Sequence, residues 1–265
     1  LDQNIFDKNS AANLTRPGSI EEKQTLGQME FLAVEQFDGG YKIKSVKDKA
    51  GNPLKYTVNG TMMRVELPRV LRPKEAFSFS VAWSYNIHDH NKFGRTPGNG
   101  RMGYEYFPKD GNHLYEIAQF FPRMAVYDDV YGWQHKQFLG NGEFTLPFGN
   151  YKVSITVPAD HILGATGTLQ NPDQVLTATQ KARLAKAKTA KSPVVIVTQD
   201  EAVQAEKSKV KTKKTWRFAA QNVRDFAFAT SRKFIWDAMQ IVQDGRPVMC
   251  MSYYPTEGNP LWGKY

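Results

Sequence analysis

Residues 54–67 have the sequence LKYTVNGTMMRVEL, in which Asn59-Gly60 separates two β-rich runs. Asn-Gly between such runs is a strong signal for a two-residue hairpin turn, because both residues tolerate a positive φ. The segment therefore predicts two antiparallel strands, at 54–58 and 62–67, and with them a fold built from hairpins.

The same strand character extends along most of the chain. Apolar and polar side chains alternate over 41–46, 77–83 and 151–157, which is typical of strands with one buried face. Further β-rich runs are 194–197, 216–218, 226–229, 234–236 and 248–253. A Gly- and Pro-rich surface loop is expected over 91–103. Strands at this spacing predict a mostly β fold, an antiparallel β-sandwich.

Composition narrows the class of protein. The 265 residues are 41% hydrophobic and 23% charged, which is ordinary for a globular chain and too apolar for a disordered one. The longest apolar runs are far shorter than the ~20 residues of a membrane-spanning helix, so no membrane span is expected. The single cysteine, Cys250, excludes an internal disulfide and a zinc site built from several thiolates. Its apolar strand favours a structural thiol.

Most of the positive charge is confined to one segment. The net charge is +9, and residues 181–214 hold ten lysines and arginines against three acids, which places seven of those charges there. Thr177 and Asp200 are expected to cap two short helices, with Leu184 and the alanines facing inward. The pattern indicates a Lys-rich helical insertion, about 173–214, with a solvated surface. One arginine and no aromatic residue accompany the lysines, so nucleic acid is not expected as a partner.

Several catalytic signatures are absent from the sequence. It contains no glycine-rich phosphate loop, no Gly-x-Ser-x-Gly elbow and no His-Glu-x-x-His, the spacing that places two imidazoles on one side of a zinc ion. His88-Asp89-His90 offers two imidazoles, but it precedes a loop and is expected to be solvated. The remaining histidines stand singly, at His113, His135 and His161. No catalytic group and no metal ligand is therefore predicted in this chain.

The most informative segment is 117–133, IAQFFPRMAVYDDVYGW. Burying Gln119 or Arg123 without a partner would cost a few kcal/mol, so each should be hydrogen-bonded or face a cleft. One interpretation pairs Arg123 with Asp128 or Asp129 as a structural corner. For Gln119, simple packing and a role in a cleft both stay open.

Three blocks of sequence carry a resemblance to a known family. The blocks, in chain order, are 119–128 with Gly132-Trp133, then 149–158 with 164–167 and 169–172, then 216–218 with 223–229 and 234–237. Together they resemble the N-terminal domain of the aminopeptidase N-like zinc metallopeptidases, the gluzincins. The first block, which begins QFFPRM, is similar in particular to bacterial members with a Gln-aromatic-aromatic-Pro-Arg/Lys pattern.

The resemblance implies a saddle-shaped, antiparallel β domain over 1–254, followed by a linker, 255–265, into a thermolysin-like catalytic domain of the same polypeptide. It implies that Gln119 helps to hold the first residue of a peptide substrate. The zinc cofactor and the general-base Glu would belong to that following domain of the parent enzyme, a zinc-dependent aminopeptidase. This chain alone is accordingly expected to bind no zinc and to be inactive.

Two positions depart from the family pattern. Many members carry an acid two residues after the Gln, where it helps to bind the amine of the substrate, and here Phe121 occupies that place. The common Asp-x-Pro after the Arg is replaced by Asp128-Asp129-Val130. Recognition of the amine would therefore rest on the other domain, and the role of the corner is less defined.

A non-enzymatic β-sandwich binding or scaffold module is the alternative, in which exposed aromatic residues such as Trp83, Trp133 or Trp262 bind sugars or a protein. A His-Glu-x-x-His in the next part of the parent chain would decide for the enzyme. The sequence opens on Leu1 rather than Met, and it is expected to begin inside a longer polypeptide. Its compartment stays open, with the periplasm or secretion favoured over the cytoplasm.

Overall fold

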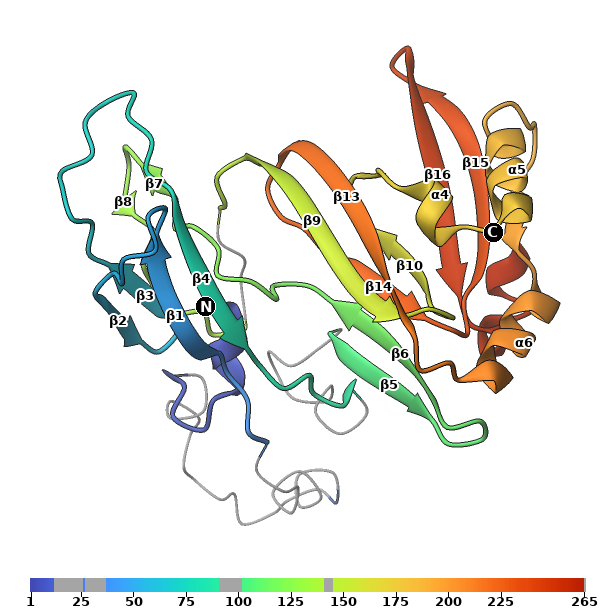
Figure 1. The fold of residues 1–265 in the computed structure, drawn as a ribbon, viewed down its shortest axis with the longest axis horizontal. Helices are drawn as coiled ribbons and strands as arrows, with labels where there is room; N and C mark the ends of the chain where they lie inside the picture. The colour runs from blue at the N-terminus through green and yellow to red at the C-terminus, as the bar shows by residue number, and fades with distance from the viewer. Residues whose placement is uncertain (12–25, 27–36, 91–101, 141–144, 265) are drawn as a thin grey trace. The chain divides into compact units, whose positions relative to one another are not determined.

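The computed structural model describes residues 1–11, 26, 37–90, 102–140 and 145–264. The chain divides into two compact units. Unit 1 comprises Leu1–Gly103 and Gln119–Pro147, and unit 2 comprises Tyr104–Ala118 and Phe148–Tyr265. Strands dominate both units (Figure 1), and the strand registers among the described residues are antiparallel. The mostly β fold with antiparallel pairing, expected from the sequence, is confirmed.

In unit 1 the strands pair in twos, β1 with β4, β2 with β3 and β7 with β8. Its elements are the 3-10 helix η1 (Asp2–Phe6), β1 (Lys42–Asp48), β2 (Tyr56–Asn59), β3 (Met62–Val65), β4 (Phe79–Ser84), β7 (Tyr127–Asp128) and β8 (Gly132–Trp133). Every residue of η1 is buried, and its Ile5 and Phe6 pack with Phe138 and Phe37. The start of the chain is therefore part of the core of unit 1.

The hairpin expected at Asn-Gly is present. β2 and β3 pair with Asn59 opposite Met62, so Asn59 ends β2 and the turn residues are Gly60 and Thr61, one position later than the Asn59-Gly60 turn expected from the sequence. Gly60, with a φ of +53°, takes the first turn position, where glycine is favoured. Gln137, far away in the sequence, secures the turn. Its Oε1 accepts a hydrogen bond from the Thr61 N–H at 2.7 Å, and its Nε2 donates to the Asn59 carbonyl at 2.9 Å.

Unit 2 contains a four-stranded sheet in the order β10-β14-β6-β5 and the three-stranded sheets β11-β13-β9 and β12-β15-β16. The strands are β5 (Gly103–Phe107), β6 (Asn112–Ile117), β9 (Gly149–Pro158), β10 (Ile162–Ala165), β11 (Thr168–Leu169), β12 (Val194–Val197), β13 (Lys213–Val223), β14 (Phe228–Ser231), β15 (Ile235–Gln243) and β16 (Arg246–Tyr254). Asp244 and Gly245 turn β15 into β16, with φ of 50° and 74°. Of the loop expected over 91–103, residues 91–101 lie outside the described part of the chain.

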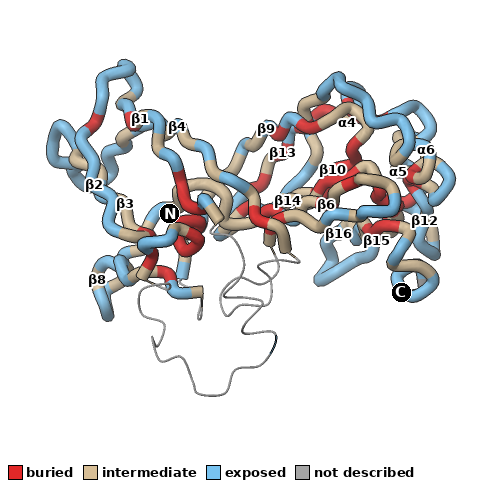
Figure 2. Tube along the Cα trace, turned by 90° about the horizontal axis from the view of Figure 1, so that it is seen from below, coloured by how far each residue is buried: buried red, intermediate tan, exposed pale blue. Residues whose placement is uncertain are grey.

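Buried aromatic side chains form much of the core of unit 2. Trp216, Phe226 and Phe234 are almost inaccessible to solvent. Gly164 in β10 lies against Tyr253 of β16, and a Cβ at this glycine would come within 2.7 Å of the Tyr253 ring. Buried positions recur along the strands of this unit, whereas the turn between β15 and β16 is exposed (Figure 2).

Helices interrupt the strands in the Lys-rich region. They are α4 (Pro172–Val175), α5 (Ala178–Ala187) and α6 (Gln199–Ser208), and two 3-10 turns, η2 (Thr256–Gly258) and η3 (Trp262–Lys264), follow β16. Thr177 caps α5 in a capping box, as expected from the sequence. The expectation that Asp200 caps α6 is wrong. Thr198 is the N-cap, because its hydroxyl accepts from the Glu201 N–H while the Glu201 side chain returns to the Thr198 N–H.

The inward face of α5 also differs from the sequence-based expectation. Leu184 is only half-buried, and the alanines expected inside are exposed, namely Ala178, Ala182 and Ala185. The helix instead turns Arg183 and Ala187 toward the protein, one helical turn apart. Arg183 donates to the Ile196 carbonyl at 3.0 Å and to Glu201 at 2.6 Å. None of the described helices is long and apolar enough to cross a membrane.

Candidate functional site

The candidate site is the segment that follows β6 and enters unit 1 at Gln119. Gln119 has a φ of +52°, in the left-handed region of backbone conformation. For a residue with a Cβ this conformation costs roughly 1–2 kcal/mol, and it persists where the surroundings hold it in place.

Two aromatic side chains bind successive carbonyl groups of this segment. The Tyr41 hydroxyl donates to the Gln119 carbonyl at 2.8 Å, and the Trp83 indole N–H donates to the Phe120 carbonyl at 3.0 Å. Tyr41 directly precedes β1, and Trp83 lies in β4 opposite Ile43 of β1. One donor therefore lies within the β1–β4 pair and the other directly before it.

Tyr41 is itself fixed from several sides. Its side chain is buried, its backbone N–H donates to Asn4 Oδ1 at 2.7 Å, and its ring meets that of Tyr85 at a centroid distance of 5.6 Å. Burial also raises the pKa of Tyr85 to about 12. Asn4 in turn donates through Nδ2 to the Gly60 carbonyl at 2.7 Å. The support of Gln119 thus extends to η1 and to the β2–β3 turn.

The side chain of Gln119 is half-buried, so it is not sealed in the interior of unit 1. Among the described residues, the side-chain amide of Gln119 has no hydrogen-bond partner, whereas its backbone carbonyl accepts the bond from Tyr41. A primary amide offers one acceptor oxygen and two N–H donors. Gln119 therefore presents an unused polar group on a restrained backbone.

Arg123 forms an ion pair that sequence analysis did not anticipate. Its Nε donates to Asp2 Oδ2 at 2.7 Å, and only 11% of each side chain is exposed. A charge-assisted bond between buried groups is stronger than a neutral one. The pair connects this segment to η1. No local sequence signal could have found it, because 121 positions separate the two residues.

The carboxylate of Asp128 accepts hydrogen bonds from residues of its own hairpin. Its Oδ1 accepts from the N–H groups of Tyr131 at 2.7 Å and Val130 at 3.0 Å, and its Oδ2 accepts from Gln134 Nε2 at 2.7 Å. The bonds from Tyr131 and Gln134 lower the pKa of this exposed carboxyl group. Asp129 is exposed in the turn between β7 and β8. Asp128 is thus bonded within the β7–β8 hairpin, while Arg123 pairs with Asp2.

The aromatic residues considered for a binding module are not alike. Trp83 is half-buried and donates to the Phe120 carbonyl, so it belongs to the support of the candidate segment. Trp133 is 60% exposed and forms an edge-to-face pair with Tyr127, at a centroid distance of 5.4 Å. Trp262 is 56% exposed and lies in the other unit. An exposed aromatic pair is present on the β7–β8 hairpin.

The described residues do not suit a catalytic metal ion, since they contain no group of three His, Cys, Asp or Glu side chains that could hold one. His88 was expected in solvent, but it is buried against Phe6, with ring centroids 4.3 Å apart. This burial lowers its pKa to about 4. The expectation was wrong because the His88 ring packs beside Gly103, which has no side chain. A Cβ at position 103 would lie only 2.9 Å from Nε2 of His88.

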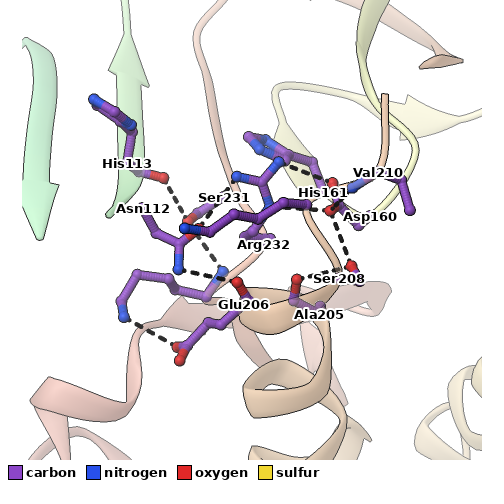
Figure 3. Close-up of polar contacts among 12 residues, drawn as sticks. Asn112, His113, Asp160, His161, Ala205, Glu206, Ser208, Val210, Ser231 and Arg232 are labelled. Carbon is purple, nitrogen blue, oxygen red and sulfur yellow. Dashed lines mark hydrogen bonds and ion pairs between the residues drawn. The ribbon is translucent and has the colours of Figure 1, made fainter. Parts of the chain in front are cut away.

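A second polar cluster lies in unit 2 (Figure 3). Arg232 donates to both carboxylate oxygens of Asp160, at 3.0 and 3.2 Å, and to Asn112 Oδ1 at 3.2 Å. Burial acts to raise the pKa of Asp160, but the bonds from Arg232, the Val210 N–H and Ser208 together lower it. Asn112 also donates to the Glu206 carbonyl at 3.3 Å, which ties α6 to β6.

The neighbouring Lys233 extends this cluster. Its side chain is 1% exposed and contacts three carboxylates, those of Asp110, Glu206 and Glu257, the last two at 3.0 Å. The ammonium group also lies over the Phe107 ring, 4.7 Å from its centroid. Because the cations and carboxylates satisfy one another, this cluster is a structural network that anchors α6 and η2. The sequence had suggested no role for Arg232, Lys233 or the carboxylates that they contact.

Comparisons with known proteins found no matching family model and no matching curated protein. Among solved structures, an M1 zinc metallopeptidase from Deinococcus radiodurans has a TM-score of 0.44 at 13% identity. A mutant of that enzyme bound to a Tyr-Ser-Ala substrate has a TM-score of 0.43 at 15% identity. In both comparisons, the aligned region covers 82% of this chain and 38% of the other. The chain thus shows a low-identity structural similarity to part of those metallopeptidases.

Proposed function

We propose that this chain forms part of the substrate cleft of a zinc-dependent aminopeptidase, which removes N-terminal residues from peptides, and that Gln119 contacts the first residue of the substrate. The observation that carries the proposal is the contrast at Gln119. Its backbone is held in a disfavoured conformation by Tyr41, while its amide has no partner among the described residues. The sequence blocks that resemble the aminopeptidase N-like family support the same role.

The chemistry of an amide side chain limits what Gln119 does. It is neutral, and it neither accepts nor releases a proton near neutral pH, so its role is to bind and orient. Its oxygen accepts from an ammonium or peptide N–H group, and its nitrogen donates to a carbonyl oxygen. Phe121 supplies no carboxylate. The positive charge of a peptide N-terminus is therefore met by groups outside this segment.

Zinc is the cofactor that the resemblance implies for the parent enzyme. The described residues of this chain do not fit that ion, because no three potential ligands come together among them. In this proposal the catalytic domain of the same polypeptide holds the metal, and this chain contributes binding contacts alone. The partners of the chain are accordingly a peptide and that domain.

The test is the Gln119→Ala variant of the full-length protein. Loss of a hydrogen bond to a charged or polarised group costs ~1.5–3 kcal/mol, so kcat/KM for an aminoacyl anilide or a dipeptide should fall ~10- to 100-fold. Gln243→Ala, at an exposed position at the end of β15, is the matched control and should leave kcat/KM unchanged. Unchanged kinetics of Gln119→Ala would reduce this residue to packing. Zinc-dependent hydrolysis by residues 1–265 alone would show that the chemistry lies elsewhere than proposed.

A non-enzymatic binding module is the second candidate, and the exposed side chains of the β7–β8 hairpin favour it. Tyr131 is 78% exposed, and Trp133 and Tyr127 form their aromatic pair beside it. Rigid aromatic side chains of this kind are common anchors in binding sites. If the full-length protein hydrolyses no peptide with zinc present, and Trp133→Ala abolishes binding of an oligosaccharide or protein, this role replaces the first.

A further inference from the structure

We infer that Tyr41 and Trp83 are positioning residues for Gln119, and that they set the direction in which its amide points without touching the substrate themselves. The inference rests on the proposed role of Gln119 in substrate binding. It names two residues that the family pattern in the sequence does not include, one before β1 and one in β4.

The Tyr41 hydroxyl holds the peptide plane that follows the Cα of Gln119. The carbonyl of Gln119 belongs to the planar peptide unit between residues 119 and 120, so the bond from Tyr41 fixes ψ of Gln119. The Trp83 indole fixes the next plane through the Phe120 carbonyl. These two planes flank the Cα of Phe120, and the first of them also contains the Cα of Gln119, so the two bonds restrain the backbone on the carboxyl side of Gln119. Gln119 itself has a φ of +52°, and a rotation of its ψ would break the bond from Tyr41.

The two donor side chains, those of Tyr41 and Trp83, are held in place by their own surroundings. Tyr41 is buried, held by Asn4 at its backbone N–H, and packed on Tyr85. Trp83 lies within the β1–β4 pair, opposite Ile43. Groups whose own positions are locked by packing and hydrogen bonds can hold a binding residue to within a fraction of an ångström. A flexible surface donor could not do so.

The alternative role of these bonds is to stabilise the fold alone. In that case, removing the Tyr41 hydroxyl would lower the midpoint of unfolding without changing substrate binding. If the hydroxyl instead orients Gln119, its removal acts on the substrate only through the Gln119 amide. The two cases differ in whether the effects of the two residues on kcat/KM are coupled.

The experiment is a double-mutant cycle in the full-length protein. Tyr41→Phe keeps the ring and removes the donor, and because misplacing a binding group weakens transition-state contacts, we expect kcat/KM to fall ~3- to 10-fold. In the Gln119→Ala background the same change should have no further effect. Tyr151→Phe is the matched control, since its hydroxyl donates at 3.3 Å to the Arg224 carbonyl in unit 2, and it should leave kcat/KM unchanged.

The outcomes separate this inference from the proposed function. If Gln119→Ala has no effect, the proposed function fails. If Gln119→Ala lowers kcat/KM but Tyr41→Phe does not, or if Tyr41→Phe costs as much with alanine at position 119 as with glutamine, the positioning role is overturned. Should Tyr41→Phe fail to fold, Trp83→Phe removes the second donor and is taken through the same cycle, with the same criterion of coupling to Gln119.

Discussion

At the scale of single residues, Gln119 combines a side chain proposed to bind substrate with a backbone conformation that lowers stability. The residue occupies a left-handed conformation that glycine adopts freely and that any Cβ disfavours. The bond from Tyr41 offsets part of this cost. The position should therefore be sensitive to whether a Cβ is present, independently of the amide group.

The corresponding prediction compares two replacements of Gln119. The Gln119→Gly variant should be more stable than Gln119→Ala by about 1 kcal/mol, because both lose the amide but only alanine keeps the steric cost of a positive φ. Urea unfolding of the two variants gives the difference from their midpoints. Equal midpoints, or a more stable alanine variant, would mean that this backbone relaxes at no cost.

At the scale of elements, the start of α6 shows how two adequate caps compete. Asp200 is a good capping residue by type, and the sequence alone favours it. In the structure the helix begins earlier, so that Thr198 forms the capping box with Glu201 and Asp200 lies in the first turn. There an aspartate interacts only with the helix dipole, which is a weaker effect.

This difference predicts an order of stability. Thr198→Ala should lower the free energy of unfolding by ~1 kcal/mol, since it leaves a backbone N–H of the first turn without its acceptor. Asp200→Ala should cost only ~0.3–0.5 kcal/mol, from the lost interaction with the dipole. Thermal or urea unfolding of the two variants is the measurement. A larger loss for Asp200→Ala would place the start of α6 where the sequence pattern had put it.

At the scale of the whole molecule, two buried histidines make the free energy of unfolding depend on pH. Burial lowers the pKa of His88 to about 4, and burial together with the nearby Arg232 lowers that of His161 to about 4. In an unfolded chain a histidine has a pKa near ~6.5. Between these values the unfolded state binds more protons than the folded state, so stability is complete above pH ~6.5 and is lost as the pH falls toward 4.

The prediction is a decline in the free energy of unfolding of up to about 3 kcal/mol for each of these histidines between pH 7 and 4. Urea midpoints at several pH values measure it. His88→Phe keeps a ring against Phe6 and should make the decline shallower. His135→Asn, at an exposed position, is the matched control. If His88→Phe and the parent protein decline equally, His88 does not contribute to the acid sensitivity.

Part of this molecule follows from local sequence. The β2–β3 hairpin, the alternation that marks β9 and the Thr177 cap each involve residues within a few positions of one another, and each is present, although the hairpin turn lies one position later than predicted, at Gly60-Thr61. The Gln-aromatic-aromatic-Pro-Arg pattern likewise identified the segment that carries the candidate site. The domain over 1–254 and the binding role of Gln119 stay predictions.

The sequence by itself determined the mostly β class, the hairpins and the residue types at the candidate site, because those depend on short-range patterns. Only the tertiary structure decided which side chains bond to the residues of the candidate site. Tyr41 reaches Gln119 across 78 positions and Asp2 reaches Arg123 across 121. Such contacts arise when distant strands and turns pack together, and no spacing along a single chain encodes which donor will meet which acceptor.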